Sequence, residues 1–267
     1  MTDDVKGRRL DDLEVSVRTF ELLSSLGIDT VGELLALPRI EVPKAWPMKI
    51  AKLVVHEIHT VLEELGETYG GQIVVPAPRE AKLQATGTVA ERWRTIAAWL
   101  EKAHPRALAQ WNPPASEATI AAVEQQLGVT FPADYRAFLA IHNGQDHDAP
   151  MVGAGPLLRV EAIAETRGNI FGQEANAIDP ELAGEGVRAV EYSRQWIPIT
   201  LSARGRDNLC LDLDPAPGGV VGQIIEYIAD ADERPLVAKS FADLLSKYFE
   251  QAQTGELDLT EIDAEDE

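Results

Sequence analysis

The sequence WNPPASEATIAAVEQQLGVTFPADYRAFLAIHNGQ, residues 111–145, predicts two short helices with their own start and stop signals. Ser116 is a favourable N-cap residue, and Gly128 suits the left-handed position that ends the first helix. Phe131-Pro132 begins the second helix, since proline is well tolerated in a first turn. Asn143-Gly144 ends it. Apolar residues at helical spacing predict a buried stripe on each helix: Ile120, Val123, Leu127, Tyr135, Phe138 and Leu139.

Several ordered motifs resemble the SUKH superfamily. In this stretch they are Trp-x-Pro-Pro, Glu-x-x-Leu-Gly, Pro-x-Asp-Tyr-x-x-Phe-Leu and a closing Asn-Gly. They continue at residues 196–199 (WIPI), 208–214 (NLCLDLD), 222–225 (GQII) and 240–245 (SFADLL). That superfamily includes Smi/Knr-type yeast cell-wall regulators and many bacterial immunity proteins. The resemblance covers most of residues 89–253 and implies an α+β domain, with helices packed on a mainly antiparallel sheet, that binds a protein partner.

The later part of the sequence predicts the sheet itself. Residues 196–200 (WIPIT) and 220–228 (VVGQIIEYI) are rich in β-branched residues, and PAPGG forms a turn. In residues 208–214 leucines alternate with Cys210, Asp212 and Asp214, so we expect one buried face and one solvent-facing face with carboxylates. Short connections favour antiparallel pairing. Residues 171–190 are irregular, and DPELAGEG predicts an exposed loop.

The resemblance and the charge together predict a partner-binding groove between the 111–145 helices and the sheet. The candidate contact residues lie at the helix end and on the strands: Asn143, Gln145, Asp146, Trp196, Asp212 and Asp214. The paired aspartates have an alternative role in acid–base or cation chemistry if a cleft covers them. The favoured interpretation is the solvated face of a sheet. Cys210, without a histidine partner, is interpreted as a packing residue.

Two histidine-containing groups invite a metal-site hypothesis. His142, Asp146, His147 and Asp148 lie close in sequence, but a solvated turn explains them better than a site without a scaffold. His56 and His59 are three residues apart on a predicted helix with no third ligand nearby. We therefore predict no metal and no cofactor.

Residues 10–68 predict a set of helices. Ser16 and a Thr30–Glu33 capping box start the first two, and a long helix follows. We expect Val17, Phe20, Leu23 and Leu26 to be buried on the first, and Ile50, Leu53, Val54, Ile58, Val61, Leu62 and Leu65 on the long one. This order resembles the C-terminal domain of the bacterial RNA polymerase α subunit, a small all-α helix-hairpin-helix module that contacts DNA and transcription factors.

Arg18 falls on that family's DNA-contacting arginine and is the candidate nucleic-acid residue. The family's asparagine three positions later is Glu21 here, and the family's Gly-x-Lys-Ser turn is absent from KAWPMKIAKLV. A glycine-free turn does not let the backbone approach a phosphate. The alternative for Arg18 is an exposed ion pair with Glu14 or Glu21.

The expected domain order is a helical domain at residues 1–70, a linker at 71–88, the SUKH-like domain at 89–253 and an acidic disordered tail at 254–267. The IVV of the linker has an alternative role in pairing with a sheet edge. The net charge of −20 divides into −5, +1, −9 and −7 over these segments. Such a chain repels phosphate backbones and attracts basic partners.

Three functions follow from these observations. The preferred hypothesis is a non-enzymatic immunity protein that binds and neutralises a basic toxin domain. The second is a transcription-associated adaptor that binds DNA or RNA polymerase through residues 1–70. An enzyme has little support, since there is no nucleophile elbow, phosphate-binding glycine loop or complete zinc spacing. One cysteine, no secretory h-region and no apolar run of ~18 residues lead us to expect a cytoplasmic protein, and the two resemblances imply a bacterial one.

Overall fold

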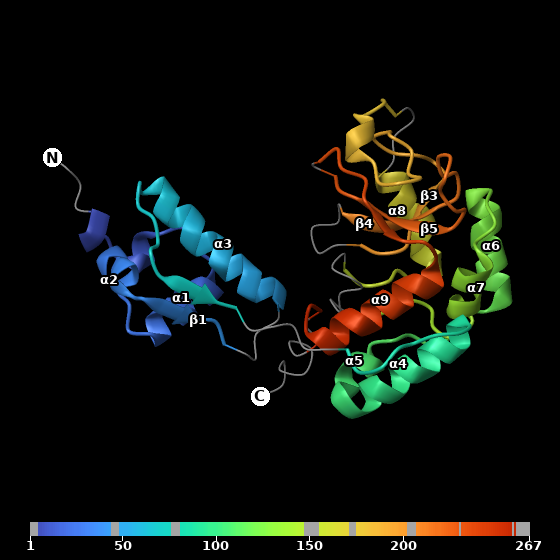
Figure 1. The fold of residues 1–267 in the computed structure, drawn as a ribbon. Helices are drawn as coiled ribbons and strands as arrows, with labels where there is room; N and C mark the ends of the chain where they lie inside the picture. Colours follow the sequence, from blue (N-terminus) through green and yellow to red (C-terminus); the bar gives the residue numbers. More distant parts are fainter. Residues whose placement is uncertain are drawn as a thin grey trace. The chain divides into compact units, whose positions relative to one another are not determined.

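The computed structural model describes residues 5–43, 48–75, 81–146, 155–170, 175–201, 207–229, 231–257 and 259. The chain divides into two compact units. Unit 1 contains residues 1–80 and 254–258, and unit 2 contains residues 81–253 and 259–267. Helices accompany a four-stranded antiparallel sheet, which confirms the α+β class (Figure 1). In the described ranges, every helix is too short or too polar to cross a membrane.

Unit 1 is mainly helical. Its elements in chain order are η1 (Val5–Gly7), η2 (Leu10–Asp12), α1 (Val17–Ser25), α2 (Val31–Ala36), β1 (Arg39–Glu41), α3 (Met48–Glu64) and β2 (Gln72–Val74). The expected caps are present: the Ser16 hydroxyl accepts from the Thr19 amide, and Thr30 with Glu33 forms a capping box. These caps satisfy backbone N–H groups that have no partner inside their helix.

The sheet of unit 1 uses residues that the sequence analysis assigned to the linker. β2 pairs with β1 in parallel register, with Ile40 opposite Ile73. Residues 72–74 thus take the alternative role of pairing with another strand. The sequence had predicted an all-α domain for this region. That prediction was wrong, because unit 1 also contains the β1–β2 pair.

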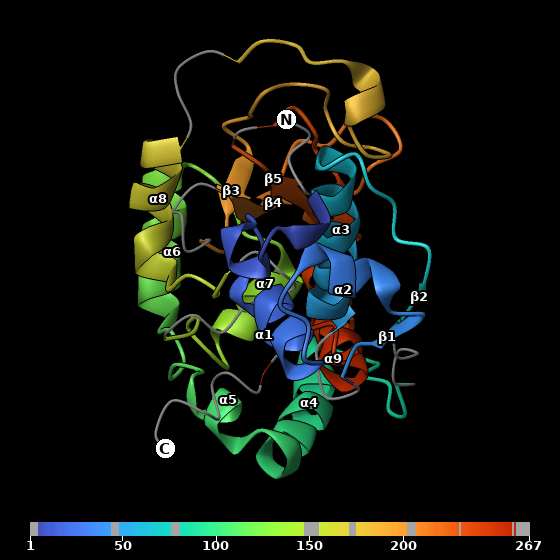
Figure 2. The same ribbon diagram turned by 90° about the vertical axis from the view of Figure 1, so that its left-hand side faces the viewer.

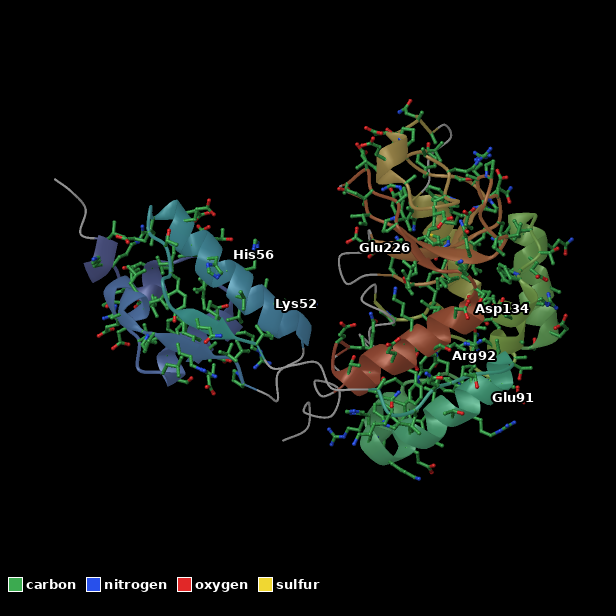
Figure 3. All side chains as sticks on the ribbon, in the orientation of Figure 1. Lys52, His56, Glu91, Arg92, Asp134 and Glu226 are labelled. Atoms are coloured by element: carbon green, nitrogen blue, oxygen red, sulfur yellow. The ribbon has the colours of Figure 1, made fainter. Side chains whose placement is uncertain are left out.

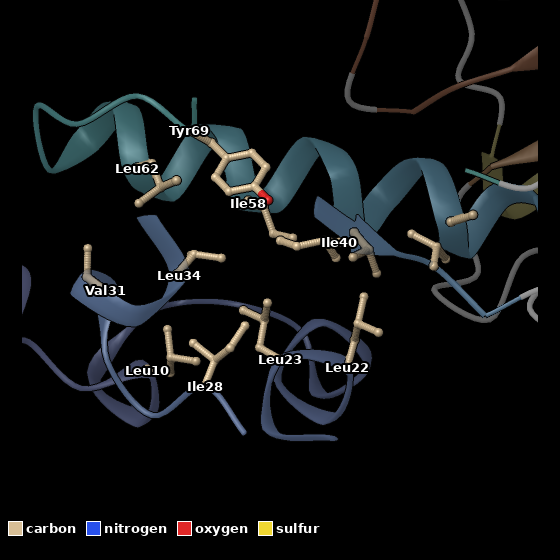
Figure 4. Packing of buried hydrophobic residues seen from close by; sticks show 13 residues of the cluster. Leu10, Leu22, Leu23, Ile28, Val31, Leu34, Ile40, Ile58, Leu62 and Tyr69 are labelled. Carbon is tan, nitrogen blue, oxygen red and sulfur yellow. The ribbon is translucent and has the colours of Figure 1, made fainter. Parts of the chain in front are cut away.

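A single apolar core holds unit 1 together, with side chains from η2, α1, α2, β1 and α3 meeting as shown in Figure 4. The buried side of α1 carries Leu22 and Leu23, whereas Phe20 is 39% exposed and Leu26 is 44% exposed. Leu53 on α3 is 39% exposed as well. The expected stripes were wrong at these three positions because a spacing of three or four residues fits more than one face of a short helix.

Unit 2 contains the predicted pair of helices and the sheet. Its helices are α4 (Val89–Ala103), α5 (Pro105–Ala109), α6 (Glu117–Leu127), α7 (Ala133–Leu139), η3 (Val160–Ala162), α8 (Ile163–Ile170), η4 (Pro180–Leu182) and α9 (Phe241–Thr254). Its strands are β3 (Trp196–Pro198), β4 (Asn208–Asp212), β5 (Gln223–Tyr227) and β6 (Leu236–Ala238). The strand order is β3-β4-β5-β6, and all pairs are antiparallel.

The helices of unit 2 form layers against the sheet. α9 lies between the sheet and α4 in both views (Figures 1 and 2). α8 packs against β3 and α6. Trp93 of α4 packs edge-on against Trp111 at 4.5 Å and Phe138 of α7 at 5.5 Å between ring centroids. Trp111 in turn contacts Tyr248 of α9. These rings join the predicted helix pair to the first and last helices.

The acidic tail begins inside the folded structure. α9 ends at Thr254, and Leu257 and Leu259 are both buried. Position 258 and residues 260–267, which make up the rest of the predicted disordered tail, lie outside the described residues.

Candidate functional site

Asn143 and Gln145, at the end of α7, are buried and bind the chain itself. Asn143 accepts from the Val160 amide at 2.8 Å and donates to a Glu161 carboxylate oxygen at 2.9 Å. Gln145 accepts from the Leu157 amide at 3.0 Å. Both side chains therefore hold the loop before α8 against the end of α7. They are positioning residues for the surface around them.

The surface around Asn143 and Gln145 carries three exposed charged residues, Asp146, Arg159 and Glu161. The Arg159 guanidinium donates to Asp146 at 2.7 Å and to the amide oxygen of buried Asn112 at 2.9 Å. The hydrogen bond that Arg159 donates to Asp146 is the main cause that raises the pKa of Arg159. We call Asn112, His142, Asn143, Gln145, Asp146, Arg159 and Glu161 the asparagine network.

His142 is the titratable member of the asparagine network. Its Nδ1 lies 2.8 Å from the Asn112 carbonyl oxygen. A carbonyl only accepts, so this nitrogen carries the hydrogen in the neutral ring. The ring packs on Trp93 at 4.8 Å. Burial lowers the pKa of His142, and the bond to Asn112 offsets part of the effect. His147 and Asp148, the other residues of the suggested metal cluster, lie outside the described residues.

Position 144, directly after Asn143, requires a glycine for two reasons. Its φ is +74°, in the left-handed region that side chains rarely adopt. A Cβ there would lie 2.5 Å from the Leu158 carbonyl oxygen. The Asn-Gly turn therefore lets the backbone at residue 144 approach the backbone at residues 158–159 closely. This approach brings Asp146 beside Arg159.

Trp196 and Asp212 form a second group on the sheet and are fully buried. They are register partners on β3 and β4. Asp212 accepts from the Asp214 amide at 3.1 Å and from the Gln223 side-chain amide at 2.9 Å. Burial raises the pKa of Asp212, and these two bonds oppose the shift. Neither Trp196 nor Asp212 presents surface to a partner in this conformation.

The expectation of a solvent-facing carboxylate side on β4 was wrong for Asp212 and Cys210. Both side chains have no exposed area. Cys210 packs with Val187 and Ile225 in an apolar cluster, and burial raises the pKa of its thiol. The irregular segment that precedes β3 covers this face of the sheet. Asp214, just beyond the strand, is half-exposed and pairs with Arg188.

Two glycines attach the covering segment to the turn between β4 and β5. A Cβ on Gly186 would lie 2.4 Å from the Gly219 Cα, so neither position has room for a side chain. The Gly186 carbonyl accepts from the Ala216 amide at 3.0 Å and from the Gln223 side chain at 2.9 Å. The GQII motif contains Gln223, but the motif alone does not reveal this role, because the groups that Gln223 binds lie elsewhere in the sequence.

Arg234 is a further residue that the sequence analysis missed. It is only 3% exposed, and its guanidinium donates to the carbonyls of Glu191, Ala231 and Glu233 at 2.6–2.9 Å. It also lies over the Tyr227 ring. Burial lowers the pKa of Arg234. A sequence pattern does not predict the burial of such an arginine, because its acceptors are main-chain oxygens, which every residue carries.

The acidic residues of the helix motifs have structural roles. Glu124 accepts from the Phe131 amide at 2.7 Å and pairs with Arg136, which also pairs with Glu117. This joins the end of α6 to the start of α7. Asp134, labelled in Figure 3, accepts from the Ala242 amide at 3.0 Å at the start of α9.

In unit 1 the candidate residues remain on the surface. Arg18 and Glu21 lie 3.5 Å apart as an exposed ion pair, which is the alternative role that the sequence offered. His56 lies on α3 with Lys52 (Figure 3). Among the described residues, no group of three or more His, Cys, Asp and Glu side chains is arranged to hold a metal ion.

The fold and the motifs define a SUKH-type domain, and comparison with known families agrees. Residues 114–247 match the SMI1 / KNR4 family (SUKH-1). The chain belongs to this family. The match begins inside the 111–145 stretch and continues through the sheet to α9.

Several of the similar proteins are named fungal regulators. A cell wall biosynthesis/cell cycle regulator of Schizosaccharomyces pombe is 33% identical over 59% of this chain and 35% of its own length. A glucan synthesis regulatory protein of Neurospora crassa is 26% identical over 66% and 42%. The cell wall assembly regulator SMI1 of Saccharomyces cerevisiae is 22% identical over 61% and 40%. The chain thus spans well under half of each relative.

These comparisons correct the functional hypotheses. These three relatives are named as cell-wall and glucan-synthesis regulators, so the prediction of a bacterial immunity protein with a toxin partner was wrong. The transcription-adaptor alternative is overturned by the same relatives. The resemblance of residues 1–70 to the RNA polymerase α subunit also receives no support, since the family match starts at residue 114. The relatives are named as regulators rather than enzymes.

Proposed function

We propose that the chain is a non-enzymatic regulator of cell-wall assembly that acts by binding a basic protein partner through unit 2. The observation that carries this proposal is how the polar motif residues are used. Glu124, Asp134, Asn143 and Gln145 all bind backbone amides of the chain itself. A reaction centre needs polar groups aimed at a substrate, whereas these groups build a scaffold.

The exposed members of the asparagine network are the proposed contact residues. Asp146 and Glu161 place two carboxylates on the surface that Asn143 positions. Residues 89–253 carry a net charge of −9. A surface of this sign steers a basic partner and repels acidic competitors. The cell-wall setting is taken from the names of the relatives.

Replacement of the matching segment in the Schizosaccharomyces pombe relative tests the proposal. The segment would be exchanged for residues 81–253 of this chain in cells that lack the native regulator. We expect restored growth in the presence of a glucan-digesting enzyme, compared with cells carrying an empty vector. A chimaera that accumulates to the native level without restoring growth would contradict the proposal.

A further inference from the structure

Residues 82–87, which precede α4, lie outside helices and strands and are held by side chains of α9 and α4. We call these residues the strap. The Gln253 side chain accepts from the Lys82 and Leu83 amides at 3.2 and 3.0 Å and donates to the Leu83 carbonyl at 2.9 Å. One side-chain amide therefore pairs with the N–H and the C=O of one residue, as a neighbouring β-strand would.

Two further side chains continue this pattern along the strap. The Ser246 hydroxyl donates to the Ala85 carbonyl at 2.7 Å. Arg92 donates to the Gly87 carbonyl at 2.9 Å and to the Ala85 carbonyl at 3.4 Å, and it also binds the Ser246 hydroxyl. Arg92 lies on α4 beside α9 in Figure 3. All the strap groups in these bonds are main-chain atoms.

The strap's register also fits a continuous site. Ser246 and Gln253 are seven residues apart and so lie on the same face of α9. They bind Ala85 and Leu83 in the opposite order, so the strap runs antiparallel to α9. Side chains that read an extended main chain in this way recognise the backbone of a peptide and only secondarily its sequence.

Burial contributes little to holding the strap. Ala85 is 4% exposed, and every other strap residue is exposed, including Leu83 at 48%. One buried methyl group contributes on the order of 1 kcal/mol, so main-chain hydrogen bonds provide most of the attachment. The single buried position requires a small side chain. Another extended peptide with a small residue there can replace the strap at low cost.

We propose that Arg92, Ser246 and Gln253 form a peptide-binding site for an extended segment with a small residue at the position of Ala85. The chain's own strap occupies this site as an internal ligand. The site is separate from the asparagine network and does not depend on the cell-wall function. Attachment through the chain gives the strap an effective concentration in the mM range, so an external peptide competes only when the strap is released.

Release of the strap tests the proposal in the full-length chain. Ala85→Glu puts a carboxylate at the buried position and should expel the strap. A fluorescent peptide with the sequence of residues 81–88, AKLQATGT, should then bind at least about tenfold more tightly than it binds the wild-type chain, measured by fluorescence anisotropy. The same peptide with Ala85→Glu should not bind.

A second variant keeps the strap sequence intact. Gln253→Met keeps the length of the side chain but removes both the acceptor of the Lys82 and Leu83 amides and the donor to the Leu83 carbonyl. These two amides should therefore exchange hydrogen at least about tenfold faster than in wild type. Gln126→Met, at an exposed position on α6, should leave that exchange unchanged. Combined with Ala85→Glu, Gln253→Met should abolish peptide binding.

Two results would overturn the proposal. One is unchanged exchange of the Lys82 and Leu83 amides in Gln253→Met. The other is fast exchange of these amides in Ala85→Glu without binding of the peptide at millimolar concentration. The first result would mean that Gln253 does not hold the strap. The second would mean that the site accepts no external peptide.

Discussion

The Asp134 carboxylate of α7 accepts a hydrogen bond from the Ala242 amide of α9 at 3.0 Å. Ser240 accepts from the Asp243 amide at 3.1 Å in the same first turn. Two side chains from distant parts of the sequence therefore share the capping of one helix. Asp134 thus fixes the start of α9, and the buried ring of the next residue, Tyr135, packs against Phe241 of that helix at 5.0 Å between ring centroids.

Substitution of Asp134 should weaken this cap. Asp134→Ala should destabilise unit 2 by about 1 kcal/mol, because the Ala242 amide loses its acceptor. Asp134→Asn retains an acceptor oxygen and should cost less. Urea unfolding of the full-length chain, followed by tryptophan fluorescence, measures both. Equal midpoints for Asp134→Ala and wild type would contradict this role.

Gly144 and Gly128 form a matched pair for the next prediction. Both have positive φ, but a Cβ on Gly128 meets nothing within 4 Å, whereas one on Gly144 meets the Leu158 carbonyl at 2.5 Å. Gly128→Ala should cost about 1 kcal/mol for the left-handed conformation alone. Gly144→Ala should cost clearly more, since the backbone must also move.

Chemical unfolding of the two glycine variants distinguishes the two contributions. If the Gly144→Ala variant lost no more stability than the Gly128→Ala variant, the close approach to Leu158 would not constrain the turn.

His142 predicts a pH dependence of stability. Burial lowers its pKa in the folded state, so the unfolded chain binds the proton more readily. The stabilisation is complete above the ordinary value of 6.5 and is lost as the pH falls through the lower folded value. His142→Asn keeps a donor for the Asn112 carbonyl and does not titrate.

The difference in unfolding free energy between wild type and His142→Asn, measured from pH 8 to pH 5, should therefore shift against wild type below about pH 6.5. A difference that stays constant over this range would contradict the assignment of a buried neutral imidazole.

Glu57 joins α3 to the start of α1 in unit 1. It accepts from the Ser16 amide at 3.1 Å, from the Ser16 hydroxyl at 2.8 Å and from the Thr19 hydroxyl. Burial raises the pKa of Glu57, but the bonds from Thr19 and Ser16 together outweigh burial and lower it. The resulting stabilisation is present above about pH 4.5 and is lost at lower pH.

Glu57→Gln should thus cost unit 1 about 1 kcal/mol at neutral pH. Faster hydrogen exchange of the α1 amides is the expected signature, with Glu63→Gln, an exposed position on the same helix, as the control. Similar exchange in the two variants would show that Glu57 does not secure α1.

Local signals in the sequence were sufficient for much of the fold. The caps at Ser16, Thr30 and Ser116 and the glycine end at Gly128 involve residues close in sequence, so their patterns identify them. The buried stripes of α6 and α7 were also predicted correctly at Ile120, Val123, Tyr135, Phe138 and Leu139, whereas Leu127 is partly exposed.

Contacts between distant segments could not be predicted in this way. Alternation in β4 indicates one apolar face, but it does not reveal that an irregular segment covers the other face through the Gly186–Gly219 contact. The site residues show the same limit. Asn143 and Gln145 were selected from their sequence position as partner contacts, but their hydrogen-bond partners at residues 157–161 carry no motif that would reveal these internal bonds.

The central claim is that exposed carboxylates of the asparagine network bind the partner while its buried amides only position them. The chimaera in Schizosaccharomyces pombe tests this directly when it carries Asp146→Asn with Glu161→Gln. A control carries Glu101→Gln with Glu250→Gln at exposed positions on α4 and α9. The account predicts unchanged protein level and thermal stability for both, with loss of growth under the glucan-digesting enzyme only for the first. Full growth of the Asp146 and Glu161 variant would contradict it.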